Sequence, residues 1–303
     1  MPKLKSEQHH WWPRCISTYW AAEDGKTGWM KPDGSYIRVP PKELGKIGNA
    51  HHIKLGHPAG NSSVWDTSFE DEFDIADSHF PSVITWLENL KYEYMPHREL
   101  SDRFLPQPAA DDQLRLLIEC VVSLAVRSPR NREASVSLAG NLRGFIGNPE
   151  RNALIGLNMR NSQRLISNSI GTHGKFAVLF TQEREFIFGD GFFHNVTAVV
   201  NPPISPKILA PITPNMSVII TRPTSFIVQP QLSTIVLTDK EVDTCNHAVQ
   251  VYSRQALYYR SQQPPVDDAF TCNEHCEYSH PDNPIDNLIC GIPGVPSRGL
   301  HYG

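Results

Sequence analysis

The chain has 303 residues, with 28 Lys and Arg against 32 Asp and Glu, and a formal net charge of −4. This balance excludes a surface coated with basic residues for non-specific DNA binding, although it allows a local basic site. A hydrophobic content of 40% and a charged content of 20% are typical of a packed domain and exclude a disordered chain.

The first part of the chain carries aromatic residues and turn signals. Pro13 predicts a short helix, because proline is tolerated at the first position of a helix. Trp29 and residues 36–39 flank a Pro-Asp-Gly turn at 32–34, and this pattern predicts a small hairpin. Residues 40–65 have no clear period and are interpreted as a loop.

The middle of the chain predicts three amphipathic helices. Apolar residues recur at steps of three and four between Phe69 and Leu90, and acidic residues crowd the first turns, where the helix dipole favours carboxylates. Pro81 predicts a kink or a break near Ser78. Two further helices are predicted, one from about Asp111 and one over 149–169, with the inward residues Leu114, Leu117, Ile118, Val121, Leu124 and Ala125, and Leu154, Leu157, Leu165 and Ile166.

Short apolar runs follow in the second half of the chain. The runs at 176–180 and 185–188 are separated by a polar turn and suggest paired strands, and two similar runs lie at 208–212 and 217–221. Thr238, with an acidic residue three positions later, predicts a capping box at the start of a last helix. We therefore predict a single α+β domain over residues 1–261. It has central helices and a small mixed or antiparallel sheet built from the N-terminal hairpin and the C-terminal strands.

The remaining segment, residues 262–303, is rich in proline and glycine and is interpreted as a mostly irregular tail. It carries four soft ligands, which are enough for a tetrahedral structural zinc: Cys272, Cys276, His280 and Cys290. A zinc clasp would explain how so proline-rich a tail becomes ordered. The alternative is a flexible tail with free thiols.

The compartment follows from what the sequence lacks. The longest apolar run, 116–126, is interrupted by Glu119 and is shorter than the roughly 20 residues that span a bilayer. The N-terminus is charged and shows no secretory signal. Six cysteines in a chain without an export signal do not indicate a disulfide framework. We expect a cytoplasmic protein without a membrane partner.

Several landmarks occur in the order seen in a known family. Residues 8–14 resemble its opening His-His-aromatic-x-Pro-Arg motif, and later landmarks are the acidic helix, Arg-Ser-Pro-Arg at 127–130, a strand leading into Asp190, Pro-Ile-x-Pro at 211–214, and Asn246. Together they resemble the domain of unknown function 4238 (DUF4238), an uncharacterised microbial family, over about residues 8–260. At Asp190 this chain has Gly-Asp-Gly-Phe, where the family tends to have Ser-Asp-Asn-Pro. The resemblance implies a fold and an intracellular microbial setting, and it implies no activity.

Two positions are candidates for acid–base or metal chemistry. Adjacent histidines on an extended segment point to opposite faces, so either His9 or His10 can face a site, and a neutral imidazole can act as general base or metal ligand. Asp190 follows a strand between two glycines, where carboxylates serve as metal ligands or bases. The structural alternatives are a histidine that caps the Pro13 helix and packs on a tryptophan, and a turn aspartate that accepts from nearby backbone amides.

Arginines are the candidates for substrate binding. Arg14 can hold a phosphate or carboxylate, or pair with the acidic helix. Arg127 and Arg130 open a segment, 127–164, whose basic residues are all arginine, a residue suited to bidentate phosphate contact and to stacking on bases. Ion pairing with the acidic helix is again the structural alternative. Asn246 lies beside the buried stripe of the last helix and is expected to reach the His10 region or to bond to backbone.

These residues predict a metal- or histidine-dependent hydrolase of a phosphodiester in nucleic acid or a nucleotide. The water would be activated either by a histidine or by a divalent metal held by a carboxylate, and the sequence leaves the cofactor open. His10 and Asp190 would be catalytic, and the substrate would contact His9, Arg14, Arg127, Arg130 and Asn246. One alternative is a non-catalytic interaction module that binds a partner through its tryptophan-rich N-terminus. Another is a nucleic-acid-binding protein that does no chemistry.

Overall fold

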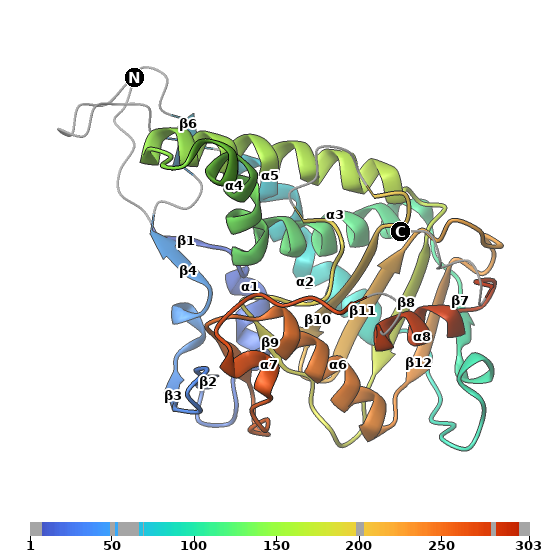
Figure 1. Ribbon diagram of the computed structural model, residues 1–303. Helices are drawn as coiled ribbons and strands as arrows, with labels where there is room; N and C mark the ends of the chain where they lie inside the picture. The colour runs from blue at the N-terminus through green and yellow to red at the C-terminus, as the bar shows by residue number, and fades with distance from the viewer. Residues whose placement is uncertain are drawn as a thin grey trace.

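The computed structural model contains a five-stranded sheet, a four-stranded sheet and the helices that cover them (Figure 1). This architecture confirms the α+β class, with helices in the middle of the chain and a small sheet shared by its two ends. The structure describes residues 8–48, 52–53, 67–68, 70–197, 203–279 and 283–296.

The N-terminal segment folds into short elements. Helix α1 begins directly after Pro13, and β2 pairs with β3 as the predicted hairpin. Strand β1 pairs with β4, and β5 with β6, so two of these strands lie inside the predicted loop. The elements are β1 (Gln8–His10), α1 (Arg14–Ser17), the 3-10 helix η1 (Thr18–Trp20), β2 (Thr27–Met30), β3 (Tyr36–Val39), η2 (Pro41–Glu43), β4 (Lys46–Gly48), β5 (His52–Ile53) and β6 (Thr67–Ser68).

The four-stranded sheet joins the two ends of the domain, as predicted. Its order is β3-β2-β13-β9, where β13 is Leu257–Tyr259 and β9 is Phe188–Gly189, and the neighbours that meet across the chain ends are antiparallel. Gly28 of β2 lies under the ring of Tyr259, and a Cβ there would lie 2.3 Å from the ring's Cζ. Only glycine permits this close approach of the hairpin to β13.

The five-stranded sheet has the order β10-β11-β8-β12-β7 and is antiparallel except between β8 and β12. Every residue of its first four strands is buried, so both faces are covered. The predicted pairing of 176–180 with 185–188 is wrong, because β8 lies between β11 and β12 while β9 joins the other sheet. The strands are β7 (Leu105–Gln107), β8 (Lys175–Phe180), β10 (Lys207–Thr213), β11 (Met216–Thr221) and β12 (Leu232–Val236).

Helix α2 (Asp74–Glu88), which follows the 3-10 helix η3 (Glu70–Phe73), continues through Pro81. The predicted break is therefore wrong. Proline lacks the N–H that would bond to the carbonyl of Asp77 one turn earlier. The thiol of Cys15 donates to this carbonyl at 3.7 Å instead, so the docking of α1 supplies the missing donor.

Three more helices follow in the chain, and α3 joins the other two to the five-stranded sheet. Helix α3 (Asp111–Arg127) packs on β10 and β11 and buries all of its predicted inward residues. Helix α4 (Pro129–Arg143) was not predicted; Ser128 caps it by accepting the amide of Asn131 at 3.2 Å. Helix α5 (Asn148–Ile170) occupies the predicted region, but the prediction that Leu157 faces inward is wrong, because that side chain is exposed.

The C-terminal region continues the packed structure. Helix α6 (Asp239–Tyr252) begins with the predicted capping box, in which Glu241 accepts the amide of Thr238 at 2.8 Å. Phe270 and Ile289 of the predicted tail are fully buried, so these described parts of the tail belong to the hydrophobic core. The other elements are η4 (Leu100–Arg103), α7 (Asp268–Thr271) and α8 (Pro284–Gly291), and α8 packs against η4 and α6.

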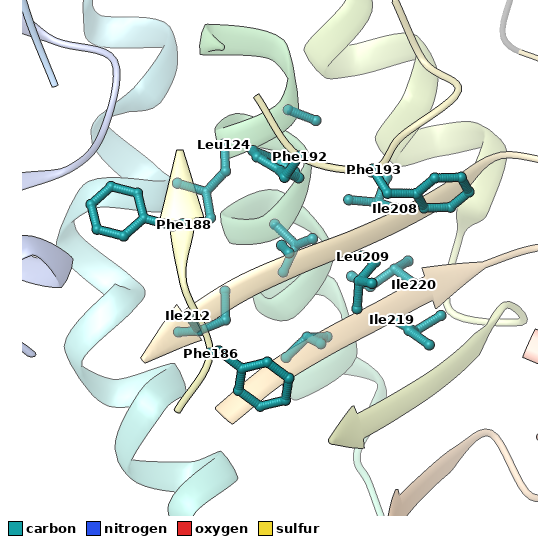
Figure 2. Close-up of a cluster of buried hydrophobic side chains, with 14 of the residues drawn as sticks. Leu124, Phe186, Phe188, Phe192, Phe193, Ile208, Leu209, Ile212, Ile219 and Ile220 are labelled. Carbon is teal, nitrogen blue, oxygen red and sulfur yellow. The ribbon is translucent and has the colours of Figure 1, made fainter. Parts of the chain in front are cut away.

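Aromatic side chains link the two sheets. The ring of Trp12 stacks on Phe188 with 4.3 Å between centroids, and Trp20 packs on the same ring. Figure 2 shows Phe188 and Phe192 in one cluster of buried hydrophobic side chains with Leu124 of α3 and residues of β10 and β11. Because Trp12 and Trp20 are fully buried, they offer no surface to a partner, and the predicted interaction surface at the N-terminus is not formed by these indoles.

Within the described ranges, no helix has the length and apolar character that a membrane span requires. This finding agrees with the absence of a long apolar run in the sequence. The cytoplasmic setting stays a prediction.

Candidate functional site

The predicted catalytic carboxylate, Asp190, is bound to backbone amides. It lies in the turn after β9 and is 6% exposed. Its Oδ1 accepts from the N–H groups of Arg254 at 2.9 Å and Ala256 at 3.2 Å, and its Oδ2 accepts from Gln255 at 3.0 Å. These contacts match the structural alternative of a turn aspartate, and they fasten the segment after α6 to the end of β9.

The glycines beside Asp190 allow this arrangement. A Cβ at Gly191 would lie 1.8 Å from the carbonyl oxygen of Tyr252, so the two backbones meet where no side chain fits. Burial raises the pKa of Asp190, while the charge of His275 and the donated amides act in the opposite direction. The carboxylate is thus a buried group that is held by three backbone donors.

The second predicted catalytic residue, His10, is half-buried in β1, and its Nδ1 lies 3.0 Å from the carbonyl oxygen of Leu44. His9 precedes it and pairs with Ile47 in the β1–β4 ladder. Among the described residues, no hydrogen bond or ion pair joins His10 to Asp190. Their direct contacts do not assemble the predicted pair, and its catalytic role stays a prediction.

The arginines singled out from the sequence are largely engaged with carboxylates. Arg127 is buried, pairs with Asp77 at 2.7 Å and lies over the ring of Phe73. Arg160 pairs with Glu72 at 2.9 Å. The acidic helix therefore neutralises part of the arginine segment, as the structural alternative expected.

Two other predicted substrate contacts are placed differently. Arg130 is buried over the ring of Tyr252, donates to the carbonyl of His194 at 3.0 Å and pairs with Glu277. Arg14 is exposed at the start of α1. The guanidinium of Arg130 is thus part of the packing around α6, whereas that of Arg14 is open to solvent.

Asn246 bonds to backbone, which is the second of its two expected roles. Its Oδ1 accepts the amide of Ile187 at 3.0 Å and its Nδ2 donates to the carbonyl of Glu185 at 2.9 Å. This side chain holds the segment before β9 against α6 and supports the hollow described below.

The predicted zinc ligands do not form a site among the described residues. The sulfur atoms of Cys272 and Cys276 are 3.5 Å apart, but no group of three metal-ligating side chains occurs in the part of the chain that the structure describes. Cys290 lies on α8, where burial raises its pKa. His280 lies outside the described residues.

A polar hollow of about 250 Å³ lies beside α6. Helix α6, the segment before β9 and the segment before α7 provide its walls. Its polar lining includes Arg184, Asp243, His247, Gln250, Gln262 and Asp267. Its size approaches the lower end of the range for small-molecule sites in proteins.

His247 is held between a phenol and a carboxylate in this hollow. Its Nδ1 lies 2.7 Å from the hydroxyl of Tyr278, and its Nε2 lies 3.8 Å from Oδ2 of Asp267. Burial raises the pKa of Tyr278, so the phenol keeps its proton. A phenol can donate to Nδ1 or accept from its N–H, so the imidazole can take or release a proton at Nε2 without losing this bond.

Hydrogen bonds between side chains and backbone hold the walls in place. Gln250 donates to the carbonyl of Pro265 at 3.0 Å and accepts the amide of Asp267 at 2.8 Å. Glu185 accepts the amide of Ser261 at 2.9 Å. These bonds fix the backbone at Asp267 relative to α6, because its segment is held by Gln250 of the helix at one end and by Glu185, in the segment before β9, at the other.

Most charges at the hollow are paired. Arg184 lies 3.1 Å from Asp243, and Arg260 pairs with Glu185. The remaining carboxylate, Asp267, faces the imidazole of His247. The local charge is therefore negative while His247 is neutral.

Of the described residues that line this hollow, only Asn246 is a substrate contact predicted from the sequence. Asp243, His247 and Gln250 follow one another at steps of four and three, so they share one face of a helix, and this polar stripe is readable from the sequence. Asp267 and Tyr278 come from the segment interpreted as irregular tail. No local period indicates that they return to α6.

Comparisons with known proteins give no relative for this chain: no protein-family model matches it, and neither do curated proteins or solved structures. The resemblance described from its motifs stays a prediction, and the function is argued from the site alone.

Proposed function

We propose that the protein is a hydrolase of a small polar substrate and that the hollow beside α6 is its active site. The observation that carries this proposal is a half-exposed imidazole, His247, held between the hydroxyl of Tyr278 and the carboxylate of Asp267 in a rigid hollow. Histidine is the side chain best suited to gain and lose a proton near pH 7. General acid–base catalysis requires such a group within reach of a substrate in an open cavity.

The arrangement supports a general-base mechanism. A water bound at Nε2 of His247 gives its proton to the ring as its oxygen attacks the electrophilic carbon or phosphorus of the substrate. The carboxylate of Asp267, 3.8 Å away, stabilises the imidazolium that forms. When the bond to the leaving group breaks, Nε2 returns the proton to that group. Tyr278 holds the ring at Nδ1 through both steps.

The charges of the hollow favour a substrate with a neutral or positively charged group. Arg184, the arginine that lines the hollow, already pairs with Asp243, and Arg260 pairs with the lining residue Glu185. Asp267 adds negative charge beside the reacting position. A phosphodiester would meet this negative charge without a free guanidinium. The phosphodiester predicted from the arginine segment therefore has less support than a neutral ester or amide.

The test measures hydrolysis by the purified full chain and by three variants, His247→Ala, His173→Ala and His10→Ala. The substrates are chromogenic esters, amino-acid amides, RNA, DNA and nucleotides, each with and without divalent metal. We expect His247→Ala to lower turnover by about 10²–10⁴-fold, the usual contribution of general-base catalysis. His173→Ala is the matched control, because this exposed histidine lies in the turn after α5 and does not line the hollow.

Each outcome decides between sites. Hydrolysis that is lost in His247→Ala and kept in His173→Ala supports the hollow. Hydrolysis that survives in His247→Ala but disappears in His10→Ala contradicts it and returns the site to the N-terminus. Absence of hydrolysis on every substrate contradicts the enzyme proposal.

A different surface favours a second candidate function, nucleic-acid binding without chemistry. Phe145, in the turn between α4 and α5, is 94% exposed, and Leu142, in the last turn of α4, is 76% exposed. Arg143, paired with Glu150, and the exposed Arg151 lie close to them in the chain. Single-stranded nucleic acid binds where an aromatic ring stacks on a base and arginines contact the backbone.

A further inference from the structure

Two cysteines lie in contact at the surface beside α7. Cys272 follows the helix and is exposed, Cys276 is half-buried, and their sulfur atoms are 3.5 Å apart. A disulfide places its sulfur atoms about 2 Å apart, so bond formation needs an approach of only about 1.5 Å. The two thiols are therefore close to the geometry of a disulfide.

The backbone holds this turn in shape independently of the sulfur atoms. Asn273 has a φ of 57°, the left-handed conformation that asparagine tolerates better than most residues. Its carbonyl accepts from Nε of Arg254 at 3.1 Å, and the amide of Cys276 donates to the carbonyl of Val251 at 3.0 Å. The fold itself thus places the two sulfur atoms close together. Formation of a disulfide would therefore cost little additional conformational entropy.

Cys272 is also more accessible to solvent than Cys15, Cys120 and Cys245. Cys120 and Cys245 are buried, and burial raises the pKa of both. Cys15 is half-buried against α2, where its thiol donates to the carbonyl of Asp77. An oxidant in solution therefore meets Cys272 before it meets these three side chains.

We propose that Cys272 and Cys276 are a reversible dithiol–disulfide site that exchanges with small disulfides such as oxidised glutathione. The thiolate of Cys272 attacks one sulfur of the small disulfide, whose S–S bond breaks and releases one thiolate. The thiolate of Cys276 then attacks Sγ of Cys272 and releases the second. Two electrons pass from the protein pair to the small disulfide, and the two protein protons pass to the two released thiolates.

The order of the two steps follows from the environment of each sulfur. Cys272 is exposed and can be reached from solvent, whereas Cys276 is half-buried. Burial and the hydrogen bond with Cys272 raise the pKa of Cys276. Cys272 is therefore the attacking thiol, and Cys276 is the thiol that resolves the mixed disulfide.

The site lies in the segment that supplies both partners of His247. Asp267 precedes the two cysteines and Tyr278 follows them. A disulfide between Cys272 and Cys276 would therefore shift the position of Asp267 relative to Tyr278. This consequence rests on the proposed function: oxidation would alter turnover at the hollow. The thiol chemistry itself does not depend on it.

The test equilibrates the full chain with defined ratios of reduced and oxidised glutathione, blocks the remaining thiols by alkylation and measures masses. We expect the oxidised wild-type protein to carry two alkyl groups fewer than the reduced protein, with a mass lower by about 2 Da before alkylation and no retained glutathione. Cys276→Ser should accumulate glutathione on Cys272, because the resolving thiol is absent. Cys272→Ser should keep its thiols reduced, and Cys290→Ser is the control that keeps the disulfide.

Three results would overturn the site. These are a stable glutathione adduct on the wild-type protein, thiols that stay reduced at every ratio, and one equivalent of tightly held zinc that protects both cysteines from alkylation. Turnover is then compared between the oxidised and the reduced protein, with a change of about tenfold expected from displaced catalytic groups. A disulfide without a change in turnover rejects the link to the hollow, while loss of the disulfide leaves the test of His247 unaffected.

Discussion

Helix α6 and the segment after it contact two polar regions that differ in how their groups are satisfied. At Asp190 the carboxylate is buried and accepts three backbone amides. At His247 the imidazole is 47% exposed and faces a carboxylate that is too distant for a hydrogen bond. A buried carboxylate whose oxygens all accept hydrogen bonds stabilises the fold. An exposed imidazole with one nitrogen free of a hydrogen bond to protein can exchange a proton with a substrate or a water. We therefore interpret Asp190 as a structural residue and keep the region of His247 as the site of the proposed chemistry.

The largest effect is expected when Asp190 is replaced by Ala. The change leaves three buried amides without an acceptor, and we expect a loss of about 3–5 kcal/mol in the free energy of unfolding, measured by urea denaturation. Asp190→Asn keeps an acceptor oxygen and should lose about half as much. A stable Asp190→Ala protein without hydrolytic activity would reverse the comparison and place the chemistry at Asp190.

The same contrast explains how much of the molecule its sequence predicts. Helix α3 was predicted because apolar residues repeat at helical spacing along one face, and the hairpin because turn residues separate two strand-like runs. The predicted partner of β8 is wrong, because β8 is buried on both faces and its apolar run does not identify its neighbours.

Site residues show the same limit. The polar face of α6 that carries His247 is visible in the sequence, because helical neighbours recur at fixed steps. Its partners Asp267 and Tyr278 reach it through tertiary packing of a segment without a period. Asp190 was found from its strand and glycines, but the three amides that saturate it belong to a distant turn. A local pattern identifies a polar side chain without revealing what satisfies it.

An intermediate effect is expected from His194, which lies close to the first region. It is fully buried, and burial together with the charges of Arg130 and His275 holds its pKa well below the usual value. The unfolded chain binds a proton at this residue below about pH 6.5 and the folded protein does not. Stability should therefore be complete above that pH and fall by up to about 1.4 kcal/mol for each pH unit below it.

The measurement compares urea denaturation of the wild-type protein and of His194→Phe between pH 7 and pH 5. Phenylalanine has a similar shape and packs in the same way against Phe192, whose ring meets the imidazole edge-on. The free energy of unfolding of His194→Phe should fall less between pH 7 and pH 5 than that of the wild type. His247→Ala should show the same fall as the wild type. If the free energy of unfolding of His194→Phe depends on pH as that of the wild type does, the buried imidazole takes up its proton in the folded state. The interpretation of His194 as a purely structural, neutral residue would then be wrong.

The smallest effect on the free energy of unfolding is expected at Phe145, in the turn between α4 and α5. Its side chain is almost fully exposed, unlike Asp190 and His194. Phe145→Ala should change the free energy of unfolding by less than about 0.5 kcal/mol, because a residue that is 94% exposed loses little packing. It should weaken the binding of a labelled single-stranded RNA by about tenfold, measured by fluorescence anisotropy at two salt concentrations. Phe145→Tyr keeps the ring and should bind as the wild type does, and Leu157→Ala removes another exposed apolar side chain as a control.

Two outcomes would contradict this prediction. Destabilisation by more than about 1 kcal/mol would mean that Phe145 has a structural contact. Unchanged RNA binding would remove the second candidate function and leave the hollow as the proposed functional region.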